Sequence, residues 1–393
     1  MSFLTSLAAA FKGGGGARVP LAHGFVSPWA VPFETRPRAT GGGWAREVEE
    51  AYLVNPIAQR AVRIVAEGVG GAPLAVNDES FARLLATSGG SQPLIEVLAA
   101  QLLLHGNAYV QVLKDGAGAP VELFPLRPDR IVVEPDERGW PGAYRYRVGT
   151  HEETLAAEDA DGWPQIVHLK TYHPGDDHYG AGCLGAARQA VAVHNAASRW
   201  NAALLENAAR PSGALVYDTR DSAGLTGEQF DRLKEELAAA FSGDGNAGRP
   251  MVLEGGLSWQ SLALSPADMD FANLKAAAAR DIALAFGVPP MLLGLPGDNT
   301  YANYREANRA LWRLTLLPLI GRIGTALAQG LAPWFPEASV AVDLDKVPAL
   351  AEDREKQWAR ISDAEFLDEA EKRELLGLPP RPAPAIQSKE DPR

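Results

Sequence analysis

Two alanine-rich helical segments, separated by a stretch with its own turns, constrain the fold of this chain more than any other feature. The first runs from Gly182 to Ala209, and its only charged residues are Arg188, Arg199 and Glu206. Alanine has the lowest free-energy cost of any residue in a helix, so this segment should be helical even where little packs against it. Pro211 ends it, because the residue before a proline disfavours the helical conformation.

The second segment begins with a helix-capping sequence. Ser265 is a favourable N-cap, Pro266 suits the first helical position, and Asp268 places an acid near the positive end of the helix dipole. Gly287 is placed to end the helix in the left-handed conformation. Two helices separated by about 55 residues of independent structure predict a paired stalk with a small subdomain at its far end.

The residues before the stalk predict a mixed domain of helices and largely antiparallel strands. Asn55 and Pro56 start one helix as N-cap and first residue, and a second amphipathic helix spans 93–105. Short alternating runs predict strands at 73–76, 108–114, 121–126, 131–134, 144–148 and 165–170. Residues 1–45 are rich in glycine and proline, a composition that cannot bury enough apolar surface to order itself, so we expect a flexible arm.

The remaining segments complete an α+β chain. The insert predicts a strand at 214–217, a helix at 226–241 and strands at 250–253 and 258–262. After a loop at 288–303, a long helix from Tyr304 to Leu331 should kink near Pro318. A strand at 340–344 should return to the sheet of the first domain, and charged helices follow at 349–360 and 363–376, before a disordered tail at 379–393.

Composition limits the function classes. The net charge of −12 argues against tight wrapping of nucleic acid, but not against nucleic acid that slides past. The single cysteine, Cys183, cannot form an intramolecular disulfide. The apolar N-terminus lacks the basic region of a signal peptide, and the run Leu314–Phe335 is interrupted by Pro318 and Arg322, which favours a buried helix over a membrane span.

Catalytic and metal-binding patterns are sparse. No phosphate-binding loop and no Gly-x-Ser-x-Gly motif occurs. His173, Asp177 and His178 could supply three metal ligands, but Pro174-Gly175 makes an exposed loop the favoured interpretation. His151-Glu152-Glu153 is expected to be a solvated turn, Gly243–Gly248 lacks the glutamate of a calcium loop, and Asp343 and Asp345 are expected to be solvated rather than an acid–base pair. We expect no metal and no cofactor, so function should depend on shape and assembly.

An ordered set of short segments carries a family resemblance. No single segment is specific, but their order and spacing are; the set is Gly182–Arg188, Glu206–Leu215, Pro250–Leu257, Ala285–Gly294 and Thr300–Asn303. Together, over roughly Asn55 to Leu344, they resemble the portal proteins of tailed double-stranded DNA phages with Hong Kong-type capsids, including prophage and gene-transfer-agent portals. The chain is short for that family, and the N-terminal arm matches none of its pattern.

The resemblance implies a structural protein without catalysis of its own. Its members form a ring, usually of twelve subunits, at one capsid vertex, within virions assembled in the bacterial cytoplasm. Double-stranded DNA passes through without sequence specificity, and the other implied partners are the large terminase, the head–tail adaptor and the major capsid protein, with no membrane. The implied parts are a wing (46–181), stem helices (182–209 and 266–287), a clip (210–265), a tunnel loop (288–303), a long helix with a return strand (304–345) and a crown (346–378).

The resemblance also suggests site residues. Lys275 and Arg280 are candidate channel cations, with an ion pair outside the channel or between subunits as an equal alternative. Asn299, Thr300 and Tyr301 are candidate DNA contacts in the tunnel loop, with a purely structural turn as the alternative. The clip would bind its partners through charged residues, namely Asp218, Arg220, Glu228, Arg232 and Arg249.

Two hypotheses from other classes stay open at this point. The chain could be a nucleic-acid-processing enzyme with residues 173–178 as its metal site, which stoichiometric metal binding would support. It could also be a membrane-associated scaffold that uses 314–335 and the apolar N-terminus, which recovery in soluble fractions without detergent would count against.

Overall fold

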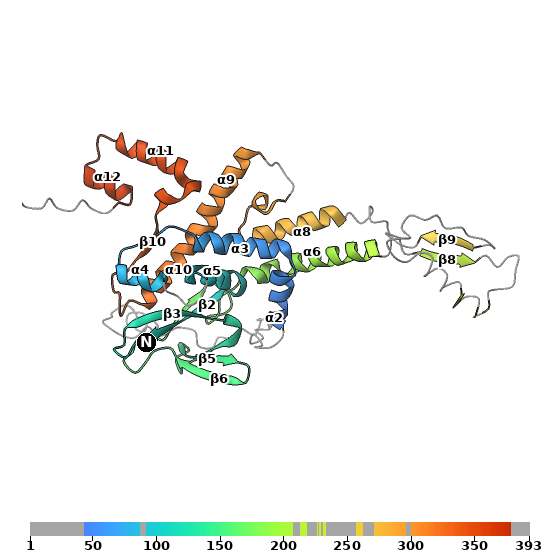
Figure 1. The fold of residues 1–393 in the computed structure, drawn as a ribbon, viewed down its shortest axis with the longest axis horizontal. Helices are drawn as coiled ribbons and strands as arrows, with labels where there is room; N and C mark the ends of the chain where they lie inside the picture. Colours follow the sequence, from blue (N-terminus) through green and yellow to red (C-terminus); the bar gives the residue numbers. More distant parts are fainter. Residues whose placement is uncertain are drawn as a thin grey trace, which may run out of the picture.

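The chain folds into helices and antiparallel strands, with two long helices projecting from a larger body (Figure 1). The computed structural model describes residues 43–86, 92–206, 213–217, 226, 228, 231, 232, 257–261, 271–295 and 300–378. The α+β class expected from the sequence is confirmed. The predicted tail at 379–393, the predicted strand at 250–253 and most of the predicted helix at 226–241 lie outside the described residues.

The helical part of the body is built on three helices that share one hydrophobic core. These are α3 (Pro56–Gly70), α5 (Leu94–His105) and α10 (Leu317–Gly330). Their fully buried side chains include Val65, Leu98 and Ile323. The predicted capping of α3 is confirmed, since the Asn55 side chain accepts hydrogen bonds from the backbone N–H groups of Ile57 and Ala58, both at 3.0 Å.

Two helical segments were not expected. The sequence predicted a flexible arm as far as residue 45, but α2 (Gly43–Val48) already begins at Gly43 and continues into a π-helical segment, η1 (Glu49–Leu53). A further helix, α4 (Glu79–Ala86), begins where the Asp78 carboxylate accepts a hydrogen bond from the Phe81 backbone N–H at 2.8 Å. Only three residues form the buried apolar face of α4, namely Phe81, Leu84 and Leu85. Three residues are too few to show a helical period in the sequence.

The strands of the body form two small sheets, whereas the sequence predicted a single one. One sheet has the order β3-β2-β7 and the other β4-β5-β6, and every pairing is antiparallel. Their bounds are β2 (Asn107–Lys114), β3 (Pro120–Leu126), β4 (Ile131–Pro135), β5 (Pro141–Val148), β6 (His151–Ala156) and β7 (Ile166–Lys170), with a 3-10 turn, η2 (Pro128–Arg130), between β3 and β4. A second hydrophobic cluster joins the sheets and includes Tyr109, Leu126, Ile131 and Tyr144.

Strand β6 corrects the expectation of a turn at His151-Glu152-Glu153. These side chains are exposed, as expected, but their backbone pairs with β5. Arg145 on β5 lies 3.7 Å from Glu152 on β6 and 3.2 Å from Glu134 on β4, so it links the charged strands on either side of it. A charged edge strand has little apolar pattern, and charge at an edge also discourages pairing with other chains.

The returning strand β10 (Val340–Val342) pairs with β1 (Leu74–Val76) in a separate two-stranded sheet. The sequence predicted the return to the first domain correctly, but not the isolation of this pair from the other sheets. Strand β10 lies against α10, where Gly324 approaches Val340 so closely that a Cβ on the glycine would lie 2.8 Å from the valine Cβ. The close packing therefore holds β10 on the helical side of the body.

The long helix has three parts in the structure: α9 (Tyr301–Leu311), a π-helical segment η5 (Trp312–Leu316), and α10. It begins at Tyr301, three residues before the predicted start. A kink was predicted near Pro318; the structure has a π-helical segment just before it, which accommodates a residue that has no N–H and would crowd the preceding turn.

By length and composition alone, the helix Tyr301–Gly330 could cross a membrane, and it is the one such helix among the described residues. Its buried apolar side chains belong to the main core; they are Leu311, Leu316, Ile320, Ile323 and Leu327. Only 33% of its most apolar stretch is buried, so the expectation of a buried helix holds for one face and not for the whole helix.

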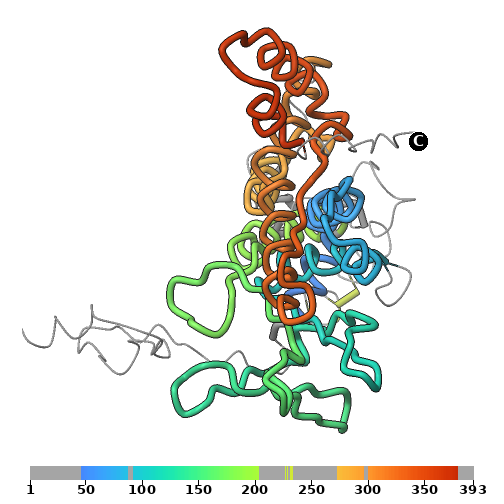
Figure 2. The backbone as a smooth tube through the Cα atoms, turned by 90° about the vertical axis from the view of Figure 1, so that its left-hand side faces the viewer, coloured from blue at the N-terminus to red at the C-terminus, as the bar shows by residue number. Residues whose placement is uncertain are grey.

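The last two helices lie at one end of the molecule, opposite the strand-rich end (Figure 2). They are α11 (Ala351–Ser362) and α12 (Glu369–Leu375), preceded by 3-10 turns η6 (Leu344–Lys346) and η7 (Pro348–Leu350). Arg309 of α9 joins them to the long helix: it lies 3.1 Å from Glu352 and 3.3 Å from Asp353. Its side chain is 13% exposed, whereas that of Arg305, one turn earlier, is 52% exposed.

His168 lies where the two sheets meet. Its ring stacks on Tyr109 with 4.2 Å between ring centroids and meets the edge of Tyr144 at 5.9 Å. Its Nε2 lies 3.1 Å from the Asn107 Oδ1, which fits an N–H donated by neutral imidazole. Burial, with smaller contributions from Lys170 and His178, lowers the pKa of His168 to about 3.

We predict that His168 makes the fold sensitive to acid. The folded state favours neutral imidazole, so this stabilisation is complete above the ordinary histidine pKa of about 6.5 and decreases as the pH falls toward 3. Between pH 7 and pH 5 the loss should be about 2 kcal/mol, because only the unfolded chain takes up the proton. Urea unfolding at both pH values should show a smaller difference for His168→Gln than for wild type. His151→Gln, on exposed β6, should match wild type; equal pH dependence in all three proteins would contradict the assignment.

Candidate functional site

The two projecting helices, α6 (Cys183–Glu206) and α8 (Phe271–Ala285), lie side by side (Figure 1). Half of their described buried positions are alanines, namely Ala187 and Ala197 on α6 and Ala278, Ala279 and Ala283 on α8. Small side chains let helix axes approach closely. The predicted helical pair is confirmed, although the predicted start of the second helix, Ser265 to Asp268, lies outside the described residues.

Both helices are anchored at the end where they meet the body. Gly287 has φ of +67°, its N–H bonds to the Leu284 carbonyl, and the Val288 N–H bonds to the Ala283 carbonyl. This pair of bonds forms a Schellman motif, and the positive φ confirms the predicted left-handed glycine at the end of the helix. Before α6, Gly182 packs so tightly that a Cβ would lie 2.6 Å from the Leu104 carbonyl oxygen, so this approach requires glycine.

A buried polar cluster ties α6 to the body, and the sequence reasoning did not find it. Asn55, which caps α3, points its amide nitrogen at the Nδ1 of His194 (3.1 Å) and the Oδ1 of Asn195 (2.8 Å). The Asn195 amide in turn donates to the Glu50 carbonyl at 2.9 Å. All three side chains are buried. The signal available in the sequence was a His-Asn pair inside an alanine-rich helix.

The two candidate channel cations occupy different surroundings. Lys275 is half-buried, and burial together with the positive charge of Lys275 lowers the pKa of His194. Arg280 is exposed. The two residues are five apart, which places them about 140° apart around the helix axis. One face of α8 therefore cannot present both side chains.

The candidate loop is shorter than predicted. A 3-10 turn, η4 (Pro290–Leu293), follows α8, and Asn299 lies outside the described residues. Thr300 is the N-cap of α9, and its hydroxyl oxygen accepts a hydrogen bond from the Asn303 N–H at 3.2 Å. Thr300 and Tyr301 therefore belong to the start of the long helix, which supports the structural alternative for Thr300. The Tyr301 side chain is 83% exposed.

The predicted clip is described only in part. Strands β8 (Gly213–Tyr217) and β9 (Leu257–Ser261) pair antiparallel near the free ends of α6 and α8 (Figure 1). Of the candidate partner-binding residues, Glu228 and Arg232 are exposed. Asp218, Arg220 and Arg249 lie outside the described residues.

The other candidate clusters have local roles. The Nδ1 of His173 accepts a hydrogen bond from the Gly175 N–H, and the Asp177 carbonyl accepts one from Lys170. Within the described part of the chain, no three His, Cys, Asp or Glu side chains are grouped to hold a metal ion. Asp343 pairs with Lys346 at 2.9 Å and Asp345 with Arg354 at 2.7 Å, and these hydrogen bonds lower the pKa of both carboxyl groups.

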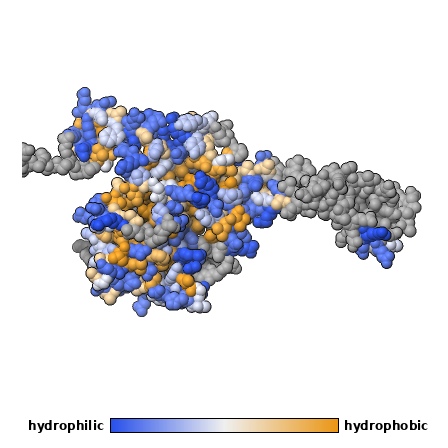
Figure 3. Space-filling view, in the orientation of Figure 1, coloured by the Kyte–Doolittle hydropathy of each residue, from blue (hydrophilic) through white to orange (hydrophobic). Residues whose placement is uncertain are grey.

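The paired helices α6 and α8 also carry exposed apolar side chains. Trp200, Leu274 and Leu284 are all more than two-fifths exposed. In the space-filling view, apolar residues are interspersed with polar ones where the helices join the body (Figure 3). The described residues therefore form a helical pair whose outer surface is partly apolar, and they include no cluster of catalytic groups on it.

Comparison with known proteins identifies the family. Residues 56–377 match the phage portal protein family. This chain belongs to the phage portal proteins.

Individual relatives agree with this assignment. An uncharacterised protein of Rickettsia felis is 40% identical over 346 residues, covering 84% of this chain and 88% of its own length. The portal protein of Enterobacteria phage HK97 is 26% identical over 251 residues, covering 62% of this chain and 55% of its own. A solved chain from the neck of a native gene transfer agent particle, computed with C12 symmetry, is 47% identical with a TM-score of 0.67; it covers 88% of this chain and 95% of its own.

The contribution of the buried polar cluster around Asn55 to stability can be measured. We predict that Asn55→Ala lowers the free energy of unfolding by about 2–4 kcal/mol, because a helix cap and two buried side-chain hydrogen bonds are lost together. Thr300→Ala, which removes a cap at an exposed helix start, should cost about 1 kcal/mol. Urea unfolding of both variants compares the two. Equal losses would show that the bonds to His194 and Asn195 contribute nothing beyond capping.

Proposed function

We propose that this portal protein forms a ring at one capsid vertex and is the channel through which double-stranded DNA is packaged and ejected. The observation that carries the proposal is the likeness to a chain in a gene-transfer-agent neck computed with C12 symmetry, at 47% identity over 88% of this chain. Twelve subunits are therefore the ring size proposed here. A closed ring repeats one heterologous contact around its axis.

The parts of the chain have distinct proposed roles. The body at 46–181 is the wing, and the helices at 182–209 and 266–287 are the stem that lines the channel. The insert at 210–265 is the clip, which would dock the large terminase and then the head–tail adaptor. The segment 288–303 is the tunnel loop, followed by the long helix and return strand at 304–345, and the helices within 346–378 are the crown on the capsid side, near the major capsid protein. The protein would reach the virion after assembly in the host cytoplasm.

Charge supports passage of DNA rather than tight binding. The chain has a net charge of −12, and tight DNA binding requires cations that neutralise phosphates. Arg280 is exposed on α8 and is the better placed of the two candidate channel cations, since Lys275 lies near His194 on the side of α6. The clip would contact its partners through charged side chains, proposed as Asp218, Arg220, Glu228, Arg232 and Arg249.

The ring itself is directly measurable. Purified protein examined by electron microscopy and native mass spectrometry should give annular particles of about 500 kDa, twelve times the 41.9 kDa chain. The hole should admit duplex DNA, whose major groove alone is about 12 Å wide. A monomer at every concentration, including in the presence of the capsid protein, would overturn the ring. A closed ring of another size would correct the number of subunits only.

The loop has a test of its own. Replacing both Asn299 and Tyr301 by alanine should reduce the amount of packaged DNA while rings still form, because the proposed contacts act on DNA and not on assembly. Thr300 is left unchanged to preserve the helix cap. Tyr172→Ala is a matched control, since Tyr172 is also 83% exposed but lies in the loop after β7. Normal packaging by the double variant would remove these residues from the DNA path.

A further inference from the structure

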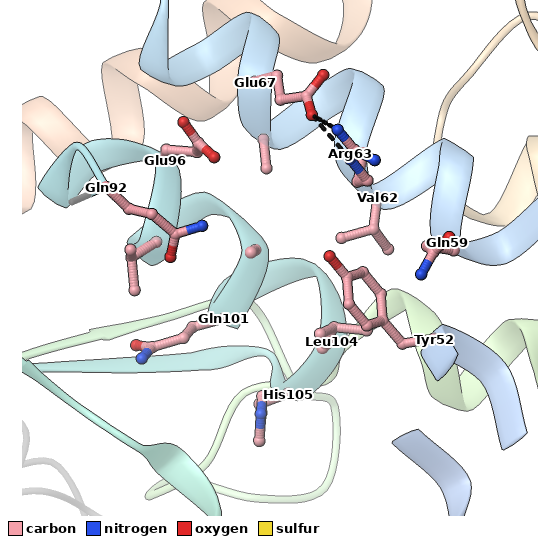
Figure 4. Close-up of a pocket in the computed structure, with 13 residues that line it drawn as sticks. Tyr52, Gln59, Val62, Arg63, Glu67, Gln92, Glu96, Gln101, Leu104 and His105 are labelled. Carbon is pink, nitrogen blue, oxygen red and sulfur yellow. Dashed lines mark hydrogen bonds and ion pairs between the residues drawn. The ribbon is translucent and has the colours of Figure 1, made fainter. Parts of the chain in front are cut away.

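A cavity of about 550 Å³ opens between η1, α3 and α5 (Figure 4). Tyr52 forms one wall, and its ring points into the cavity. Most of the other lining groups are polar, including Gln59, Glu96 and Gln101. Cavities of this size hold a small molecule or a few residues of peptide.

The polar groups of the cavity favour a cationic occupant. Arg63 and Glu67 pair with each other at 2.6 Å, but no ion pair engages Glu96 within the described part of the chain. Arg63, Glu67 and Glu96 together leave the lining one negative charge in excess. Gln101 donates its amide N–H to the Leu126 carbonyl, and its Oε1 is buried without a hydrogen-bond partner among the described residues. Carboxylate and amide oxygens are acceptors, which a guanidinium or backbone N–H would satisfy.

The same chain carries a matching segment. Residues 1–42 contain Lys12, Arg18, Arg36 and Arg38 but only one acid, Glu34, and so carry a net charge of +3. Since the whole chain is −12, the remaining residues carry −15. The N-terminal arm is therefore a basic segment attached to an acidic protein.

The chain before Gly43 is long enough for Arg36 and Arg38 to reach the cavity. From Gly43 to Tyr52 the helical segments α2 and η1 rise about 14 Å, at about 1.5 Å per residue. An extended chain covers the same distance in about four residues, at about 3.4 Å each. If the chain reverses at Gly41-Gly42-Gly43, where glycine imposes no steric barrier to a turn, residues 36–38 reach Tyr52.

We propose that the segment Arg36-Pro37-Arg38 of the same chain occupies this cavity, with an arginine guanidinium paired to the Glu96 carboxylate. The segment is tethered close by, so its effective concentration at the cavity is in the millimolar range. Even a weak ion pair and a few backbone hydrogen bonds therefore hold it in place. The proposal concerns one chain and does not depend on ring formation.

Disulfide trapping tests the contact in the full-length protein. In a Cys183→Ser background, Pro37→Cys is combined with Gln59→Cys at the cavity, or with Gln92→Cys on its other wall. Both arginines are retained. A disulfide requires the two Cα atoms to come within about 7 Å. The matched control is Pro37→Cys with Gln189→Cys, because Gln189 is exposed and adjacent to Arg188, which contacts Glu47 of α2 at 2.9 Å.

The expected result is an intramolecular disulfide that forms faster with position 59 or 92 than with position 189. Adding Glu96→Arg should slow trapping by roughly three- to tenfold through loss of the ion pair and charge repulsion, whereas Glu137→Arg, the same charge change on an exposed turn, should not. Equal rates at the cavity and at Gln189, or no bond to either wall in folded protein, would overturn the proposal. Disulfide-linked dimers in place of intramolecular bonds would assign the cavity to the arm of another copy and would likewise refute it.

Discussion

The side chain of Asn55 is the interaction on which the geometry of this molecule depends most. A single amide caps α3 with its oxygen and holds α6 with its nitrogen, through His194 and Asn195. Buried polar groups cost free energy unless all their hydrogen bonds are made, so the cluster permits one relative placement of the two helices and penalises others. A helix that projects far from the body requires this kind of anchor, because a small angular error at its base grows along its length.

The helix formed by α9, η5 and α10 connects the main core to the helices at the other end of the molecule. Its buried face completes the main core, its π-helical turn absorbs Pro318, and Arg309 joins it to α11 through Glu352 and Asp353. Arg309 is nearly buried, and removal of one partner from such a pair leaves an uncompensated charge. The tie between α9 and α11 is therefore stronger than the count of surface ion pairs around it suggests, since exposed pairs such as Arg305–Glu352 contribute little.

The elements that the sequence predicted well are those whose signals are local. Pro56 after Asn55, the alanine-rich run after Gly182 and the glycine at 287 each define a helix boundary through backbone chemistry that neighbours in space do not alter. The failures depend on partners far along the chain. His151–Ala156 is a strand because its backbone pairs with β5 and Glu152 pairs with Arg145 of that strand. Strand β10 pairs with β1 across more than 250 residues. The same holds for the site, where His194 acquires its role only from Asn55.

The arrangement of charge explains why an acidic protein suits the proposed channel. Three arginines are already engaged within the chain: Arg188 of α6 with Glu47, Arg309 with Glu352 and Asp353, and Arg354 with Asp345 in a pair of hydrogen bonds. Cations held in this way gain less from a passing phosphate, because each new contact must break an existing one. DNA that meets few free cations encounters shallow energy minima along its path and so moves with small barriers. The basic N-terminal arm differs from these arginines, because its cations have no carboxylate partner within the arm except Glu34. The cavity beside Glu96 offers such a partner on the body.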